Sequence, residues 1–507
     1  MPGAHVRSCH RPPNALAYWP RQSAHHGCLP WLRPLELDQV EPLINKAMWW
    51  FSAGDQLVTI NRRDFISTVG CSLAAGAVTS DSSAKEAKLA TADNYGNWSV
   101  VRNQFDLAPG WLQMSQFFIV SHPRPVREAI ERYRRAIDAN PFLVVHYGLS
   151  PDPVPASLAV EGNLPLRVRR AAAEYVGGQP DEIALTDSTT EGLALIYNGL
   201  TLNSGDEVLT TSHDHFVHHE SIRLACERSG ASWRRAPLYA APQSATAEEM
   251  VDNLRRAIEA KTRVIGLTWV HSSTGVKVPV RALTQVVAEA NRNRDAQKRI
   301  VVVLDAVHGF GNQDAELATL GCDFVAAGTH KWIFAPRGTG IIWAPTSNWG
   351  LLRPTVPTFS DPYHEQSSAW QDNHAPAGPT HASWMSPGGF KAYEHQWAMA
   401  DAFEFHGRIG RTRVAERIAK LNTLCKDGLA RIPKVKVLTP PDPALSAGII
   451  CFEVEGQTQK ETVTKLLARK VVASTSPYKV SYARLAPSLV NDERDVEAAL
   501  RAVREIV

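Results

Sequence analysis

An α/β fold with a mainly parallel sheet between helices is the architecture that the sequence predicts. Short, almost wholly apolar runs alternate with longer segments in which apolar residues recur every three to four positions. Runs that are apolar on both faces indicate strands covered by helices on two sides. The predicted strands are 182–186, 207–211, 264–270, 300–305, 323–328 and 340–344. Helical periodicity predicts helices over 131–140, 248–260 and 280–293.

Length and composition leave room for two domains. The chain has 507 residues, 44% of them hydrophobic and 21% charged, which is ordinary for a globular protein. We expect a large domain over 100–385 and a small α+β domain over 386–507, in which one or two helices (392–432) precede two or three strands and a final helix (493–507). A net charge of +3 gives no electrostatic footprint for nucleic acid. No uncharged apolar run is long enough to span a bilayer.

Residues 1–90 are predicted to be a non-globular extension, in which no helical or strand period persists over 1–47 and a signal-like stretch follows Met48. Within it, residues 61–77 read NRRDFISTVGCSLAAGA, and the paired arginines before a mildly apolar stretch resemble a twin-arginine export signal, with Met48 as the expected start. The alternative is an amphipathic leader helix. The first interpretation predicts a periplasmic protein, and the second leaves a cytoplasmic one.

Ligands of parallel α/β sheets bind at the carboxyl ends of the strands, so the residues after each predicted strand are candidates for function. Lys331 follows the strand at 323–328 in the stretch VAAGTHKWIFAPRGTG. One interpretation is a lysine that snorkels at a strand edge, with its stem on apolar surface. The other is a desolvated lysine whose amine acts as a nucleophile.

Two other strand ends carry groups for charge recognition. Asp305 ends the β-branched run 300–305, where a buried carboxylate needs a partner. One interpretation is a buried ion pair or a helix cap, and the other is a carboxylate that holds a proton on a ring nitrogen. The stretch DSTTEGLALIYNGL (187–200) opens a helix with hydroxyl residues. Ser188 or Thr189 can cap that helix with Glu191 closing a capping box, and the same helix start can cradle a phosphate.

Four histidines follow the strand at 207–211, in SHDHFVHHES (212–221). His215 and His219 would share a helix face, as in a metal site, yet no further ligand pattern completes one. A flat imidazole that stacks on an aromatic cofactor is the preferred interpretation, and no metal is expected. A hydroxyl cluster, HSSTGVKVPV (271–280), follows the next strand.

Together, these strand ends offer an anion cradle, a flat imidazole, hydroxyls, a buried carboxylate and a lysine. This is the set that pyridoxal phosphate requires: phosphate capture, a stacking face, a partner for the pyridinium nitrogen and an amine for the Schiff base. The order of these groups on successive strands predicts pyridoxal 5'-phosphate as the cofactor.

Over residues 100–505 the chain resembles the class V aminotransferase family of fold type I pyridoxal phosphate enzymes, and it looks similar to the isopenicillin N epimerase branch, in which HKW precedes a Pro/Gly stretch such as APRGTG. The resemblance implies that Lys331 is the Schiff-base lysine, that Asp305 pairs with the pyridine nitrogen and that His308 lies near the phenolic oxygen of the ring. It implies the remaining cofactor contacts as well, with His215 stacking on the ring, Thr189, Thr190 and His330 at the phosphate, and Ser272, with Ser273, beside the ring.

The same resemblance implies a substrate clamp. Arg484 lies in YARLAPSLVNDERDVEAAL, which is similar to the family's arginine-containing segment near the end of the chain. A guanidinium can bind an α-carboxylate through two parallel hydrogen bonds. The substrate is therefore expected to be a small-molecule amino acid.

Two departures from the family pattern bear on the reaction. Cysteine desulfurases carry a cysteine on the loop after the lysine, and here no cysteine occurs between 323 and 424, which disfavours a persulfide route. Where many relatives have a Gly-Thr that reaches the partner subunit's phosphate, this chain reads SPGGF (386–390), with Gly389 in place of the hydroxyl. A homodimer is still expected.

The seven cysteines include no CxxC pair, which argues against a zinc module and a disulfide scaffold.

The expected function is chemistry at the α-carbon of an amino acid, either transamination or isopenicillin N epimerase-like epimerisation. The alternative is a pyridoxal phosphate-dependent C–S lyase or other β-lyase. Two further alternatives are a binding protein without catalytic activity and a metal-dependent enzyme built on the histidines. The chain is irregular and aromatic from about 345 to 390, and the aromatic loop 349–384 within it is expected to select among these reactions. Its candidate residues are Tyr363, His364, Trp370 and His374.

Overall fold

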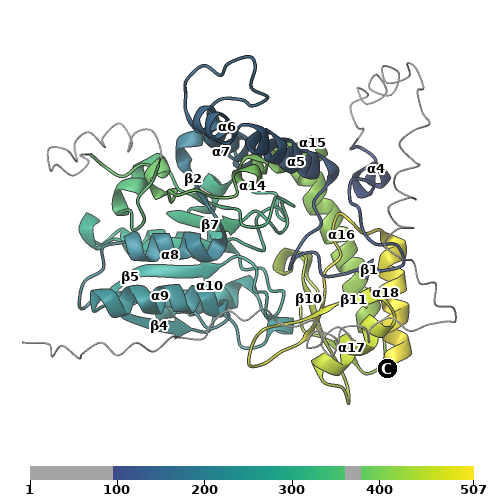
Figure 1. Cartoon of the computed structure of the whole chain (residues 1–507). Helices are drawn as coiled ribbons and strands as arrows, with labels where there is room; N and C mark the ends of the chain where they lie inside the picture. Colours follow the sequence, from purple (N-terminus) through teal and green to yellow (C-terminus); the bar gives the residue numbers. More distant parts are fainter. Residues whose placement is uncertain (1–94, 360–377) are drawn as a thin grey trace, which may run out of the picture. The chain divides into compact units, whose positions relative to one another are not determined.

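The computed structural model describes residues 95–359 and 378–507. Its largest sheet has seven strands, of which Figure 1 labels β2, β4, β5 and β7. The strand order is β2-β8-β7-β6-β5-β3-β4. Only β8 runs antiparallel to its neighbours, and all other pairs are parallel. The strands are β2 (Ile183–Thr186), β3 (Glu207–Thr211), β4 (Ser232–Ala236), β5 (Thr262–Thr268), β6 (Val301–Asp305), β7 (Phe324–Gly328) and β8 (Gly340–Trp343). The predicted α/β class is confirmed, and all six predicted strands are present.

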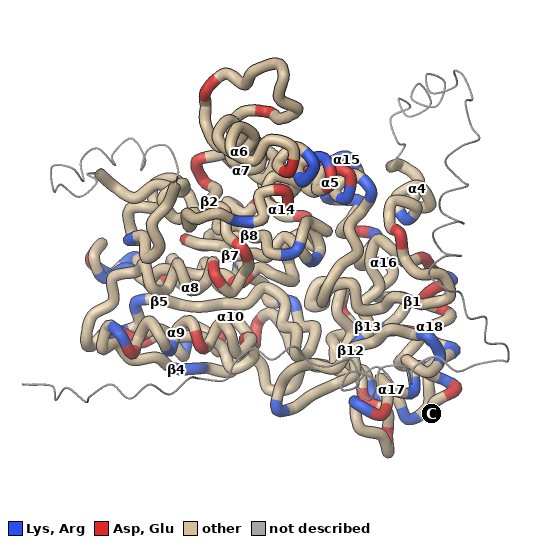
Figure 2. Tube along the Cα trace, viewed as in Figure 1, with Lys and Arg blue, Asp and Glu red and all other residues tan. Residues whose placement is uncertain are grey.

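Helices cover both faces of this sheet. Successive strand residues point to opposite sides, and in these strands the apolar side chains on both sides are buried. In β6, Val302 and Leu304 pack in one apolar core with α7, α10, α11 and α15, whereas Val301 and Val303 pack in a second core with α8 and α9. The helices of the first face are α7 (Leu164–Val176), α10 (Ala247–Ala257), α11 (Val280–Asn291) and α15 (Met399–Ile409), and those of the second are α8 (Thr189–Gly199) and α9 (Phe216–Ser229). Charges of both signs are interspersed along the helices, while the central strands carry few (Figure 2).

A second, antiparallel sheet of order β12-β13-β10-β9 lies toward the C-terminus and packs against α16, α17 and α18. The two-residue strand β1 (Leu112–Gln113), from the beginning of the described chain, pairs in parallel with β11 (Val471–Val472). Segments far apart in the sequence therefore build this part together. Its other elements are α16 (Arg411–Ala430), α17 (Gln459–Ala468), α18 (Glu493–Ile506), β9 (Val435–Val437), β10 (Ile450–Val454), β12 (Ser474–Thr475) and β13 (Ala483–Leu485).

Three helices, not one or two, occupy the segment predicted as helical over 392–432. They are α14 (Tyr393–Trp397), α15 and α16. Gly410, at φ +96°, separates α15 from α16, because a backbone in the left-handed region cannot continue an α-helix. The remaining helices of the described chain are α4 (Trp98–Arg102), α5 (Arg124–Ala139) and α6 (Pro141–Leu149).

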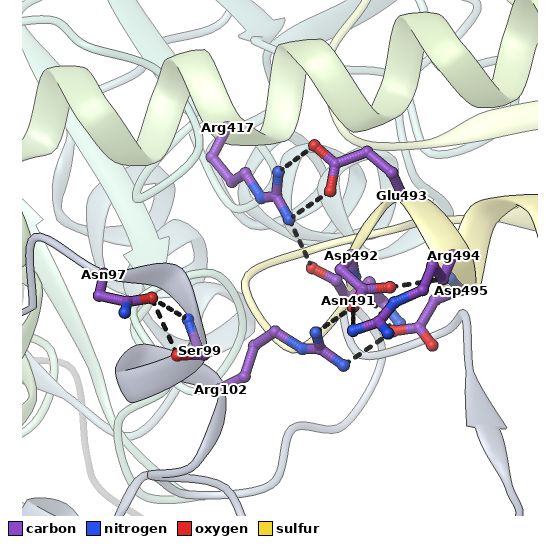
Figure 3. A network of polar contacts seen from close by, with 9 residues as sticks. All are labelled: Asn97, Ser99, Arg102, Arg417, Asn491, Asp492, Glu493, Arg494 and Asp495. Atoms are coloured by element: carbon purple, nitrogen blue, oxygen red, sulfur yellow. Dashed lines mark hydrogen bonds and ion pairs between the residues drawn. The ribbon is translucent and has the colours of Figure 1, made fainter.

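A polar network fixes α4 to the start of α18 (Figure 3). Arg102 forms ion pairs with Asp492, whose side chain caps α18, and with Asp495. Arg417, from α16, donates to both carboxylate oxygens of Glu493, at 2.7 and 3.2 Å, and to the carbonyl of Asn491. The guanidinium of Arg417 is nearly buried, so these hydrogen bonds form away from bulk water.

Replacement of Arg417 by alanine is expected to lower the free energy of unfolding by about 2 kcal/mol, because it removes a two-pronged, charge-assisted contact and leaves the Asn491 carbonyl without its donor. Urea denaturation measures the effect. Arg494 is the matched control, since its side chain is 92% exposed although it also pairs with Asp492. Arg494→Ala should change stability by less than about 0.5 kcal/mol, and equal effects of the two variants would contradict the assignment.

Among residues 95–359 and 378–507, no helix combines the length and the apolar character needed to cross a membrane. The predicted extension over 1–90, with its twin-arginine-like stretch at 61–77, lies outside the described residues. The same is true of the loop candidates Tyr363, His364, Trp370 and His374.

Candidate active site

Nine of the ten residues predicted for the cofactor and the substrate carboxylate line one cavity of about 230 Å³ at the carboxyl ends of the parallel strands. Ser273 is not among the lining residues, and its hydroxyl donates to the carbonyl of His213 at 3.4 Å instead. The structure thus gathers side chains that are up to 295 positions apart in the sequence, from Thr189 to Arg484. They are Thr189, Thr190, His215, Ser272, Asp305, His308, His330, Lys331 and Arg484. A larger cavity of about 540 Å³ lies elsewhere and contains none of them.

Lys331 lies in the turn after β7, half-buried, with its remaining exposure at the cavity. Burial lowers the pKa of its amine to about 8, an effect that nearby Asp305 opposes and Arg484 reinforces. Its Nζ is 3.5 Å from Nε2 of His308. Desolvation therefore raises the neutral fraction of the amine near neutral pH far above that of an ordinary lysine, and a nucleophile reacts through this neutral form. The lowered pKa favours the desolvated interpretation of this lysine over the snorkelling one.

Asp305 ends β6, directly beside Thr268 at the end of β5. Its side chain is almost completely buried, and Oδ1 accepts a hydrogen bond from the N–H of Val307 at 3.0 Å. Burial raises the pKa of the carboxyl to about 6, although this hydrogen bond and Lys331 both lower it. A carboxylate in this environment is stabilised by a protonated group placed in the cavity, such as the nitrogen of a pyridine ring.

The beginning of α8 carries the groups that an anion cradle requires. Ser188 caps the helix, because its hydroxyl oxygen accepts a hydrogen bond from the N–H of Glu191. The Glu191 carboxylate accepts from the N–H of Asp187, whereas a capping box would have it accept from the N–H of Ser188. Thr189 Oγ1 accepts from the N–H of Gly328 at 2.6 Å, which leaves its hydroxyl hydrogen to donate elsewhere, and Thr190 is exposed at the cavity. First-turn amides and these hydroxyls fit a phosphate group.

The four histidines of 212–221 have different neighbours, so they do not form a cluster. His213 stacks on Tyr239 with ring centroids 3.8 Å apart, His218 bonds to the hydroxyl of Tyr197, and His219 bonds to the carbonyl of Thr211. His215 alone of the four lines the cavity. In the described part of the chain, no group of three His, Cys, Asp or Glu side chains is arranged to hold a metal ion.

His215 is held as the cap of α9, where its Nδ1 accepts from the N–H of Val217 at 3.3 Å. Burial, followed by the positive charge of Lys331, lowers the pKa of this imidazole to about 4. The ring is therefore neutral near pH 7. His330 also lines the cavity, and its Nδ1 lies 3.2 Å from the carbonyl of Thr339.

Arg484 is oriented by hydrogen bonds to Ser272 O (3.0 Å), Thr475 O (2.7 Å) and Ser474 Oγ (3.2 Å). Its guanidinium also lies over the ring of Phe117, 4.8 Å from the centroid. A guanidinium has five N–H groups, so two remain after these three contacts. That number suits a bidentate bond to a substrate carboxylate.

Among the cavity residues that were not predicted from the sequence, Tyr478 and Phe117 contact predicted ones. The hydroxyl of Tyr478 lies 2.7 Å from Oγ of Ser272, and its ring meets His215 edge-on. Phe117 lies beneath Arg484 and also contacts the ring of His308. The one sequence feature that could have indicated Tyr478 is its position six residues before Arg484. For Phe117, no neighbouring sequence pattern indicates a place in the cavity.

The cavity as a whole fits pyridoxal phosphate. It combines a desolvated amine, a buried carboxylate with a raised pKa and a helix start with free hydroxyl hydrogens. These groups match the aldehyde, the ring nitrogen and the phosphate of that molecule.

Comparisons with known proteins agree with this fit. The family model Aminotransferase class-V matches residues 164–502. The isopenicillin N epimerase of Amycolatopsis lactamdurans is 25% identical over 360 residues, covering 70% of this chain and 84% of that protein. A probable cysteine desulfurase of Vibrio cholerae serotype O1 is 22% identical over 404 residues, covering 76% and 91%.

Among solved structures, the cystine C–S lyase C-DES in complex with its reaction product cysteine persulfide superposes with a TM-score of 0.67 at 21% identity, covering 78% of this chain and 98% of that chain. This similarity concerns the fold. The predicted family and fold type are confirmed, because the family model spans both the central sheet and the C-terminal sheet. The chain belongs to the class V aminotransferase family, whose cofactor is pyridoxal 5'-phosphate.

Proposed function

We propose that the chain is a pyridoxal phosphate-dependent enzyme that acts at the α-carbon of an amino acid, as a transaminase or an isopenicillin N epimerase-like enzyme. The observation that carries this proposal is the presence of Lys331, Asp305 and Arg484 in one cavity. The 25% identity to isopenicillin N epimerase over most of both chains supports the second reaction type. A homodimer is part of the proposal, and light scattering of the purified protein tests it.

Each of the three residues has a distinct role. Pyridoxal phosphate supplies an aldehyde that condenses with amines and a ring that stabilises negative charge on the α-carbon. Arg484 binds the α-carboxylate and so orients the bond to be broken. Asp305 keeps a proton on the ring nitrogen, and Lys331, once its amine is free, removes and returns the proton at the α-carbon.

A C–S or other β-lyase is the second candidate, supported by the structural similarity to the cystine lyase C-DES. Transfer of sulfur to a cysteine of the enzyme is not supported by the described residues, where Cys226, Cys322, Cys425 and Cys451 are all buried. Burial raises the pKa of each of these thiols, so the reactive thiolate is disfavoured. A lyase that releases its sulfur product does not require such a cysteine.

Exchange of the α-proton tests the proposal. The protein loaded with pyridoxal phosphate is incubated in D₂O with each common amino acid, and loss of the α-proton signal is followed by NMR. Exchange with at least one amino acid is expected. The products then separate the candidates, since a keto acid indicates transamination, the mirror-image amino acid indicates epimerisation, and pyruvate with a released β-substituent indicates a lyase. Absence of exchange with every amino acid tested would contradict chemistry at the α-carbon.

The rate of cofactor uptake is expected to rise with pH, with a midpoint near pH 8. Burial lowers the pKa of Lys331 below its ordinary value, so its neutral, nucleophilic form increases as pH rises through about 8 and is complete above it. Stopped-flow absorbance of the apoprotein mixed with pyridoxal phosphate measures the profile. A midpoint near the ordinary lysine value, above 10, would show that Lys331 is not desolvated.

A further inference from the structure

Trp332, the residue after Lys331, makes a contact that determines which nitrogen of His308 carries a proton. The indole Nε1 lies 3.3 Å from His308 Nδ1. An indole N–H only donates, so His308 Nδ1 must be the acceptor. In a neutral imidazole the single proton is then on Nε2, the nitrogen that lies 3.5 Å from Lys331 Nζ.

His308 is neutral in this environment. Burial lowers its pKa well below the ordinary value, and the positive charges of Lys331 and Arg484 act in the same direction. The charged or titratable groups around Lys331 and His308 are Asp305, Arg484, His215 and His330. Only Asp305 among them favours a positive charge on the lysine.

An Nε2–H at this position stabilises one form of the lysine. A neutral amine has a lone pair that can accept this hydrogen bond, whereas an ammonium group has none. We infer that Trp332 is a positioning residue, which holds His308 in the Nε2–H tautomer so that this N–H faces the Lys331 amine. The inference rests on the proposed function, because the consequence is a lysine that is ready to react with an aldehyde.

The surrounding packing holds the indole in this orientation. Trp332 is buried to 99% and lies nearly parallel to the ring of Phe117, at an angle of 20°. Its far edge lies against Gly448, where an added Cβ would come within 2.5 Å of the indole Cη2. Gly448 thus leaves the space that the indole occupies, and the ring has little freedom to turn away from His308.

Trp332→Phe tests the inference, since phenylalanine keeps an aromatic ring and removes only the N–H donor. His308 is then free to place its proton on Nδ1 and to accept from an ammonium at Nε2. We expect the midpoint of cofactor uptake against pH to rise by about one unit, which at pH 7 slows uptake roughly tenfold. Trp349→Phe is the matched control, because this equally buried indole donates to Asp181 O at 3.0 Å and does not line the cavity.

A second pair of variants isolates the tautomer. In His308→Gln the amide has no tautomers, so adding Trp332→Phe should produce no further shift of the midpoint. The inference would be overturned if Trp332→Phe shifted the midpoint equally with and without His308→Gln. It would also be overturned if Trp332→Phe caused no shift in the protein that retains His308.

A direct measurement covers the case in which Trp332→Phe does not fold. ¹⁵N NMR of histidine-labelled wild-type protein, with His308→Gln used to assign the signal, should show His308 protonated at Nε2. A proton on Nδ1 would overturn the inference. Wild-type protein that takes up no pyridoxal phosphate would instead contradict the proposed function, while the NMR measurement would still decide the tautomer.

Discussion

Replacement of Lys331 by alanine is expected to reduce the rate of α-proton exchange by at least about 10³-fold, because the group that moves the proton is lost. Lys331→Arg should be nearly as inactive. An arginine keeps the positive charge but cannot become a neutral amine near pH 7. The pair of variants therefore distinguishes a nucleophilic and basic amine from a simple cation. Turnover with the amino acid identified by exchange is the measurement.

Lys277 is the matched control for this experiment. Its amine is also largely enclosed, its pKa is lowered by burial, and it donates to Oε1 of Gln313 outside the cavity. Lys277→Ala should leave turnover per folded molecule within a factor of about 3, since ordinary non-catalytic substitutions act on stability and not on the chemical step. A Lys331→Ala protein with near wild-type turnover would contradict the assignment.

Asp305→Asn is expected to lower turnover by about 10²–10³-fold while leaving the fold intact, because it removes one preorganised charge from the reacting site. The amide keeps the size of the carboxylate and can still accept from the N–H of Val307. What it loses is the negative charge that holds a proton on the ring nitrogen. Steady-state kinetics with saturating cofactor separates this effect from weaker cofactor binding.

Asp323 provides the comparison for this variant. It is a buried carboxylate at the opposite end of β7, where it accepts from the N–H of Val302 and from Arg299. Asp323→Asn should reduce stability and leave turnover per folded molecule unchanged. If Asp305→Asn affected only stability as well, the carboxylate would be a structural residue and not part of the chemistry.

Strand ends were the most predictable part of this molecule. Runs such as 300–305 are apolar on both faces because helices cover both sides of the sheet, so the first polar residue after each run marks the edge where ligands bind. Asp305 is the first polar residue after its apolar run, and Lys331 is the third residue after the run 323–328; both were predicted from these positions, and both line the cavity. The edge strand β4 was missed, because its sequence SWRRA is largely polar and exposed and does not have the pattern of a buried strand.

Long-range packing was the least predictable part. Phe117 reaches the cavity from a segment near β1, which pairs with β11 some 360 residues later, and no local pattern reports such a contact. Tyr478 follows a proline in an irregular stretch between β12 and β13, where neither helical nor strand periodicity applies. The contact between Trp332 and His308 likewise depends on the turn geometry after β7.

The most direct test of the central claim is to locate the cofactor on the chain. The protein is purified, its visible absorption is recorded with pyridoxal phosphate added, and the sample is reduced with borohydride and digested for mass spectrometry. We predict a visible band in the wild type that reduction abolishes, with the pyridoxyl group on the peptide containing Lys331. A protein that remains colourless with added cofactor, or a label on a different lysine, would contradict the account.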